Sequence, residues 1–222
     1  MITHSLLSSW LYSMKENPYE DAESTAEPMA DFLRTLRREP TPTTEAMQKG
    51  IDFENLVADI LADKVRPEFV TDGTINTSSY SGEVMGYDKY PKWYYAAKKV
   101  ANIIRGGLLQ VPESKTVEIG GMQILLYGRL DALKAGTVYD IKFSGSYDRG
   151  KYFDSTQHPM YLELVPEAQS FVYIISNGTE VWTEEYRREE LITPITYIAS
   201  DFLDWLSAMG LMELFKEKWL AL

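Results

Sequence analysis

Apolar residues recur along this chain with two different periods, and those periods predict where its helices and strands lie. Spacings of three and four residues are typical of one helix face, and alternating or continuous apolar runs are typical of strands. The helical spacings cover residues 3–20, 44–65, 91–109, 156–164 and 194–220. The strand patterns cover residues 111–119, 122–133, 138–143, 170–176 and 181–187. This order of elements predicts a central sheet covered by helices.

Turn and capping residues mark several boundaries of these elements. The helix-end signals are Asn17-Pro18, Thr43 or Thr44, and Pro91. The hairpin signals are Gly120-Gly121, Lys134-Ala135-Gly136-Thr137 and, as a tight turn, Asn177-Gly178. We expect residues 21–44 to form a surface connection with a helical patch near residues 29–38, and residues 68–90 to hold short strands and turns.

The composition fits one globular domain. The chain has 222 residues, of which 45% are hydrophobic, and this is enough for one sizeable core. No apolar run approaches the roughly 20 residues of a membrane span, and the first residues lack the pattern of a signal peptide. We therefore expect a cytoplasmic protein with no membrane partner, and homo-oligomer formation stays open.

Cysteine content and charge exclude several kinds of site. The chain contains no cysteine, which excludes disulfides, iron-sulfur clusters and thiolate zinc sites. Its formal net charge of −11 argues against DNA binding through a broad basic surface. Local DNA binding through bound metals and a few cations remains open. An excess of carboxylates also suits hard cations such as magnesium.

Two neighbouring strands carry the residues with the clearest chemistry. In V-Y-D-I-K-F, over residues 138–143, Asp140 and Lys142 share one strand face, opposite an aromatic and aliphatic face. A hairpin to the preceding strand would bring Asp131 close to Asp140. The two carboxylates are then placed to share a divalent cation, with the backbone carbonyl of Ile141 as a further ligand. Lys142 would contact the attacking water or the phosphate of a phosphodiester.

Each of these residues also has a simpler explanation. A D-x-K triplet on a strand is often a surface ion pair, and a lone helical carboxylate such as Glu54 is usually solvated. Gln157 and Tyr161 lie four residues apart on one helix face, where they could simply cap and pack. His4 and His158 have no metal-ligand spacing, so we expect both to be structural.

Four short motifs follow one another in a set order. They are G-I-D-F-E (residues 50–54), G-R-L-D-A (128–132), D-I-K (140–142) and Q-x-x-x-Y (157–161). This order resembles the PD-(D/E)XK nuclease superfamily, and within it the RecB-like and lambda-type phage exonuclease branch. The resemblance implies an α/β (α+β) fold, with a central mixed β-sheet flanked by helices and a restriction-endonuclease-like core over about residues 45–187. We expect one domain, which adds an N-terminal helical segment (1–44) and a C-terminal helix (194–220).

The resemblance also implies roles for individual residues. The implied ligands of Mg²⁺ or Mn²⁺ are Glu54, Asp131, Asp140 and the backbone carbonyl of Ile141. The implied catalytic residues are Asp131, Asp140, Lys142, Gln157 and Tyr161. Arg149 and Lys151, in the loop after the D-I-K strand, are candidate DNA contacts. The opening S-L-L-S-S-W-L is similar to the N-terminal segment of iron-sulfur members, but without cysteines no cluster is expected.

These residues favour an enzyme, and two other functions stay open. The leading hypothesis is a metal-dependent deoxyribonuclease, expected to be an exonuclease in phage replication, recombination or repair. Its partners would be DNA and a recombination or single-strand annealing protein, in a bacterial or phage-infected cell. The alternatives are a catalytically inactive nuclease-fold protein that binds a protein partner, and a site-specific endonuclease. The complete set of Asp131, Asp140 and Lys142 favours the enzyme, whereas the negative charge favours the inactive relative.

Overall fold

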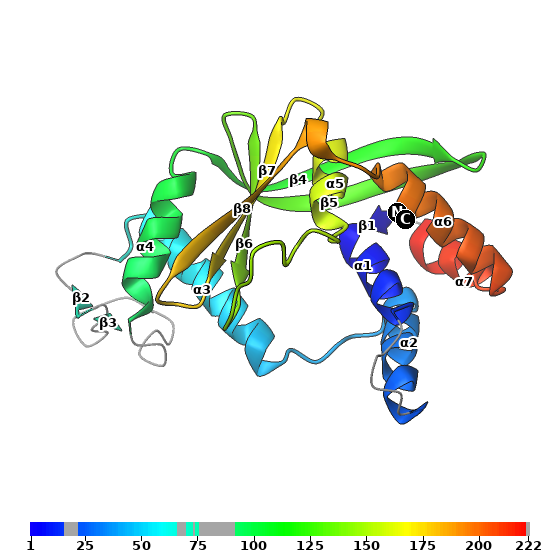
Figure 1. Ribbon diagram of the computed structural model, residues 1–222, viewed down its shortest axis with the longest axis horizontal. Coiled ribbons are helices and arrows are strands. Elements are labelled where there is room, and N and C mark those ends of the chain that lie inside the picture. The colour runs from blue at the N-terminus through cyan, green and yellow to red at the C-terminus, as the bar shows by residue number, and fades with distance from the viewer. Residues whose placement is uncertain (16–21, 66–69, 73, 76–91, 221–222) are drawn as a thin grey trace.

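A mixed six-stranded sheet forms the centre of the molecule (Figure 1). The computed structural model describes residues 1–15, 22–65, 70–72, 74–75 and 92–220. The strands of this sheet are β1 (Ile2–Thr3), β4 (Leu108–Ile119), β5 (Met122–Lys134), β6 (Thr137–Phe143), β7 (Ser170–Ser176) and β8 (Val181–Arg187). Their order is β1-β5-β6-β7-β8, and β4 also pairs with β5. The pairs β1–β5 and β6–β7 are parallel and the others antiparallel, so the predicted mixed sheet is confirmed.

Helices cover both faces of this sheet (Figure 1). On one face, α3 (Glu45–Leu61) and α4 (Trp93–Ile104) bury one hydrophobic core. The helices on the other face are α1 (His4–Ser13), α2 (Ala22–Leu36), α5 (Gln157–Leu164), α6 (Ile195–Ala208) and α7 (Met212–Phe215). They bury a second core, so the predicted helical cover is confirmed. A separate small sheet pairs β2 (Val70–Thr71) with β3 (Thr74–Ile75).

The turns between strands follow the sequence signals in two of three cases. Ala135 and Gly136 both have positive φ, 48° and 75°, which is the geometry of a two-residue hairpin turn. Gly120 and Gly121 repeat this arrangement between β4 and β5. The tight turn expected at Asn177-Gly178 is wrong, because four residues separate β7 from β8. There the Asn177 side chain accepts the N–H groups of the last two loop residues and holds the longer loop.

Several predicted helices are shorter than their apolar spacing suggests. α1 ends at Ser13 rather than at residue 20, and Asn17-Pro18 lies outside the described residues. α4 ends at Ile104 rather than at residue 109, and Pro91 is also outside them. The helix predicted over residues 194–220 is interrupted, because Gly210 has φ of 68° after α6. α7 and a π-helical turn, η5 (Lys216–Leu220), follow it.

The segment predicted as a surface connection, residues 21–44, contains α2 instead. Phe32 and Leu36 of this helix are fully buried. The Phe32 ring packs against Phe202 and Trp205 of α6, with centroid separations of 6.2 and 5.4 Å. These partners come from the other end of the chain, so the local composition does not reveal them. None of the helices in the described ranges is long and apolar enough to cross a membrane.

Candidate active site

One edge of β5 is left open between two other strands. β4 pairs along one edge of β5. The opposite edge pairs with β1 at Leu126 and Tyr127, and with β6 from Ala132 onwards. Residues 128–131, which read G-R-L-D, therefore face no strand of the described chain along this edge. Residues of the sequence motifs lie around this gap. Strand β1 borders the gap at Leu126 and Tyr127, and the sequence pattern did not predict this strand.

Asp131 lies at the end of this gap, next to β6. Its Oδ2 atom accepts a hydrogen bond from the backbone N–H of Ile141 at 2.8 Å. Its Oδ1 atom accepts one from the Gln110 side chain at 3.3 Å. Leu130 and Ala132 belong to opposite cores, although residues two apart on a regular strand share a face. The alternation of β5 is therefore interrupted at Asp131, and the carboxylate takes the place of a strand partner.

Asp140 and Lys142 form an ion pair on one face of β6, as the alternation predicts. The Lys142 ammonium lies 2.8 Å from Oδ2 of Asp140. Asp140 is only 4% exposed, so this is not the solvated surface pair of the simpler explanation. Among the described residues Oδ2 has no aligned hydrogen bond in addition to the ion pair.

Gln157 connects α5 to this ion pair. It is the first residue of α5, and its side-chain amide donates a hydrogen bond to Oδ1 of Asp140. Both side chains are buried. Pro159 follows in the first turn of the helix, where its missing N–H costs nothing. The structure thus brings Gln157 to the strand acid that the resemblance assigned to the metal.

Tyr161 lies on the same helix face and covers the gap in β5. Its hydroxyl donates a hydrogen bond to the backbone carbonyl of Arg129 at 3.0 Å. Its ring lies directly over Gly128, where an added Cβ would come within 2.3 Å of Cε1. The glycine of G-R-L-D is therefore required by the close approach of this ring. The packing role expected of Tyr161 in the simpler explanation is confirmed; a part in catalysis stays a prediction.

The three acids repel one another across the gap. Burial, together with the charges of Asp131 and Asp140, raises the pKa of Glu54 to about 7. Burial and the Asp140 carboxylate raise the pKa of Asp131 to about 6, against the opposing effect of the Ile141 N–H. The half-buried Glu54 of α3 is thus close enough to sense both strand acids, and it is not simply solvated.

Burial and neighbouring charges act in opposite directions on the pKa values of Asp140 and Lys142. Burial raises the pKa of Asp140, although Lys142 and Gln157 act in the opposite direction. Burial lowers the pKa of Lys142, but the attraction of Asp140 and Asp131 outweighs it and holds this pKa above its usual value. Lys142 therefore stays charged at neutral pH, as its acidic neighbours predict.

His4 borders the site, which the sequence did not indicate. Its ring meets the Tyr161 ring edge-on, at a centroid distance of 5.5 Å. Burial and the nearby Lys142 charge lower its pKa to about 4, so the imidazole is neutral at pH 7. Its carbonyl accepts a hydrogen bond from Thr156 at 3.0 Å, which ties α1 to the start of α5. His4 reaches Tyr161 because the N-terminal segment packs on α5, and no local sequence motif predicts that contact.

The remaining candidate residues lie in the loop after β6 and on the far side of α5. Lys151 donates hydrogen bonds to Ser144 Oγ at 2.7 Å and to the Ser146 carbonyl at 3.1 Å, within its own loop. Arg149 is exposed and lines a separate hollow beside β8. DNA contact by either residue stays a prediction. His158 is buried against aromatic rings, which agrees with its expected structural place.

Comparisons with known proteins add little to this geometry. No family model matches the sequence, and no curated protein matches it. One solved structure, titled "Crystal structure of SSO0001", is 18% identical to this chain, with a TM-score of 0.40. The match covers 70% of this chain and 86% of that one. A likeness of this size does not establish a shared function.

The residues at the gap suit a divalent cation by donor type. Carboxylate oxygens are the ligands that magnesium and manganese prefer. The repulsion that Asp131 and Asp140 exert on Glu54 is a feature that a bound cation would relieve. Within the described ranges, however, no three His, Asp or Glu side chains stand together as a ligand set. The ligand assignment, including the Ile141 carbonyl, therefore stays a prediction.

Proposed function

We propose that this chain is a divalent-metal-dependent nuclease of the PD-(D/E)XK superfamily that hydrolyses phosphodiester bonds in DNA. The observation that carries the proposal is the meeting of Asp131 from β5, the Asp140–Lys142 pair from β6 and Gln157 from α5 beside one gap in the sheet. Glu54 of α3 is near enough for its pKa to respond to both strand acids. All four sequence motifs contribute to this region, the fourth of them through Gln157. A scattered set of surface ion pairs would not produce this convergence.

Each residue has a defined part in the proposed reaction. Glu54, Asp131 and Asp140 would hold Mg²⁺ or Mn²⁺, which when bound neutralises phosphate charge and lowers the pKa of a water. Lys142 stays protonated, so it would act on the phosphate or the water as a fixed positive charge and not as a general base. Gln157 orients the Asp140 carboxylate through its hydrogen bond.

The raised carboxyl pKa values support this assignment. Acids that repel one another in a dry site stay partly protonated until a cation offsets their charge. Glu54, with a pKa of about 7, and Asp131, with a pKa of about 6, behave in this way. A cation that binds here would displace their protons, so its binding would strengthen as the pH rises.

The finer assignment rests on the resemblance of the motifs. The Q-x-x-x-Y helix and Glu54 point to the RecB-like and phage exonuclease branch. We therefore propose an exonuclease in replication, recombination or repair, in the cytoplasm of a bacterial or phage-infected cell. A recombination or single-strand annealing protein would be its partner. A site-specific endonuclease is less well supported by that helix.

A second function, a catalytically inactive nuclease-fold protein that binds a protein partner, has two observations in its favour. The net charge of −11 opposes DNA binding through a broad surface. The Lys142 ammonium lies 2.8 Å from Oδ2 of Asp140, the oxygen that a metal cation would bind. A metal would have to compete with this ion pair, whereas an inactive relative would simply retain it.

A cleavage assay separates the two functions. The full-length protein is incubated with end-labelled linear DNA and with covalently closed circular DNA, in Mg²⁺, Mn²⁺ or EDTA. We expect metal-dependent loss of the linear substrate and protection of the circle, which identifies an exonuclease. Cleavage of both substrates would indicate an endonuclease. No cleavage of either at millimolar metal would support the inactive relative.

A further inference from the structure

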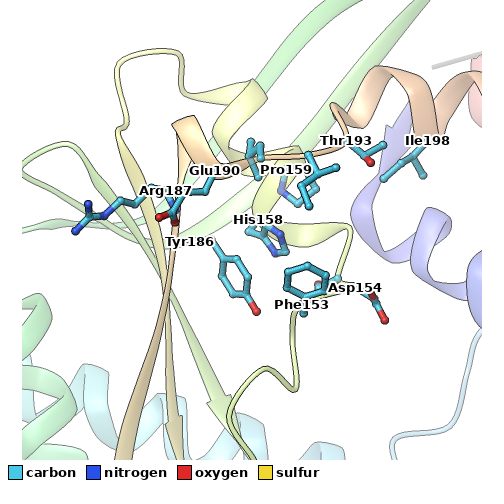
Figure 2. Close-up of a pocket in the computed structure, with 12 residues that line it drawn as sticks. Phe153, Asp154, His158, Pro159, Tyr186, Arg187, Glu190, Thr193 and Ile198 are labelled. Carbon is cyan, nitrogen blue, oxygen red and sulfur yellow. The ribbon is translucent and has the colours of Figure 1, made fainter.

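A cavity of about 360 Å³ opens beside the first turn of α5 (Figure 2). Its lining comes from residues 153–155, from α5, from the end of β8 and from residues 190–193 and 198. Figure 2 shows the rings of Phe153, His158 and Tyr186 grouped on one side of this cavity. Its volume is within the range of small-molecule sites.

Three aromatic rings line one side of the cavity, and Phe153 is the most exposed of them. The His158 and Tyr186 rings are stacked, with centroids 4.0 Å apart and planes inclined by 10°. His158 is 5% exposed, and its Nδ1 atom lies 3.4 Å from the Tyr173 hydroxyl. Burial lowers the pKa of His158 to about 4, so the ring is neutral at pH 7. At the rim, Phe153 leaves 61% of its surface open to a ligand.

The charges around the cavity favour a ligand without negative charge at this point. Asp154 and Glu190 line it, and Arg187 is the one cation among its lining residues. A phosphate here would meet two carboxylates. A planar ring with amino groups would stack on the exposed Phe153 ring and donate hydrogen bonds to the same carboxylates.

The cavity adjoins the candidate active site. Ser155 and His158, which line it, flank Gln157 in the chain. Tyr173 lies between the two places, because its hydroxyl meets His158 while its ring lies 6.0 Å from the Lys142 ammonium. A DNA strand carries both phosphates and flat bases. A phosphate suits the Lys142 ammonium, and a base suits the aromatic, carboxylate-lined cavity.

We propose that this cavity binds an unstacked nucleobase of the DNA strand whose phosphate lies at Lys142. The inference rests on the proposed nuclease function, and it adds the place where the substrate base is held. Adenine, cytosine and guanine carry exocyclic amino groups that would donate hydrogen bonds to Asp154 and Glu190, whereas thymine has no such group. Stacking on aromatic side chains would make this binding tolerant of sequence.

The test is a titration of the full-length protein with deoxyadenosine monophosphate in EDTA, followed by calorimetry and by saturation-transfer NMR. Deoxyribose 5-phosphate, which lacks the base, is titrated in parallel. We expect the nucleotide to bind at least about ten-fold more tightly, with the strongest saturation transfer to its base protons. Equal binding of the two ligands, or binding of neither, would overturn the inference.

Two variants locate the binding. Phe153→Ala should weaken nucleotide binding by about ten-fold, because it removes an exposed stacking surface at the rim. Leu108→Ala is the matched control, since Leu108 is an equally exposed apolar side chain, at 64%, on the distant β4. Unchanged binding by Phe153→Ala would place the base elsewhere. DNA cleavage without base-dependent binding would contradict base binding in the cavity and leave the proposed nuclease standing. Base-dependent binding without any cleavage would contradict the proposed nuclease.

Discussion

The side-chain amide of Gln157 donates a hydrogen bond to Oδ1 of Asp140, so the first residue of α5 orients the acid at the centre of β6. The other oxygen of the same carboxylate faces the Lys142 ammonium at 2.8 Å. Asp140 is thus held between an amide from a helix and a cation from its own strand. This contact gives the Q-x-x-x-Y motif a direct physical link to the D-I-K motif.

Gln157→Ala should lower DNA cleavage by about ten-fold or more, because it removes a group that positions Asp140. It also leaves a buried carboxylate oxygen without its donor, which costs about 1–3 kcal/mol of stability. The hydrogen bond lowers the pKa of Asp140, so its loss should move the acidic limb of the cleavage profile to higher pH. The pH profile of cleavage measures this shift.

Gln169→Ala is a suitable control, since Gln169 is exposed and its side chain donates a hydrogen bond to the Glu167 carbonyl in its own loop. It should leave both the rate and the pH profile unchanged. If Gln157→Ala lost stability while its remaining cleavage kept the wild-type rate and pH profile, Gln157 would be a packing residue alone.

Gly128→Ala should destabilise the protein by about 1–3 kcal/mol, because the new methyl group would overlap the Tyr161 ring. Urea denaturation measures the change. Gly145→Ala is the control, since a Cβ there meets nothing within 4 Å. Combining Gly128→Ala with Tyr161→Leu should recover part of the loss, because the two sites are in contact. Strictly additive losses would show that the ring is not the obstacle.

Much of the site could be predicted because its signals are local. The alternation on β6 places Asp140 and Lys142 on one face, and the turn at Ala135 and Gly136 brings β5 alongside. The four-residue spacing of Q-x-x-x-Y puts its two side chains on one face of α5. These patterns need only the neighbouring residues, and the structure bears out each of them.

The parts that could not be predicted depend on contacts between distant segments. β1 is two residues long, which is too short for a strand pattern, and it is held by pairing with β5. His4 reaches Tyr161 only because α1 packs on α5. Asp131 accepts the Ile141 N–H where the alternation of β5 is interrupted. The residues of G-R-L-D give no sequence signal for this interruption.

Stability should depend on pH through Glu54. Its pKa is about 7 in the folded protein, against an ordinary value of 4.5, so the folded state binds this proton more tightly. The resulting stability is fully present below about pH 4.5 and is lost as the pH rises through 7. The free energy of unfolding is measured in EDTA for the wild type and for Glu54→Gln. The wild-type value minus the Glu54→Gln value should decrease as the pH rises from 4.5 through 7.

This comparison removes the opposing effect of the histidines. His4 and His158 have a pKa of about 4 in the folded state, so they favour folding as the pH rises from about 4 to 6.5 in both proteins. Glu185→Gln, which removes an exposed carboxylate on β8, is the matched control for the change of charge. A difference between wild type and Glu54→Gln that is flat with pH would contradict the placement of Glu54 at the site.

Metal binding should release protons. Calorimetric titration with Mn²⁺ at pH 6, in buffers of different ionisation enthalpy, should show proton release, because Glu54 and Asp131 are partly protonated there. At pH 8 the release should be smaller. Asp131→Asn should weaken binding strongly. The absence of heat at millimolar Mn²⁺ for the wild type would rule out the cation site.

Lys142→Ala separates catalysis from metal binding. Removing one preorganised charge of this kind typically costs on the order of 100- to 1000-fold in rate. Metal affinity should stay equal or rise, because the ammonium no longer occupies Oδ2 of Asp140. Asp140→Asn should lose both metal and cleavage. Lys115→Ala, which breaks a half-buried ion pair between β4 and Glu163 of α5, is the control and should retain both.

The most direct measurement is the cleavage rate of linear DNA by purified Lys142→Ala protein, with Mn²⁺ affinity determined on the same sample. The proposed nuclease predicts a rate at least about 100-fold below that of the wild type, with undiminished Mn²⁺ affinity. A variant that cleaves DNA at the wild-type rate would contradict the assignment of the site at Asp131, Asp140 and Lys142.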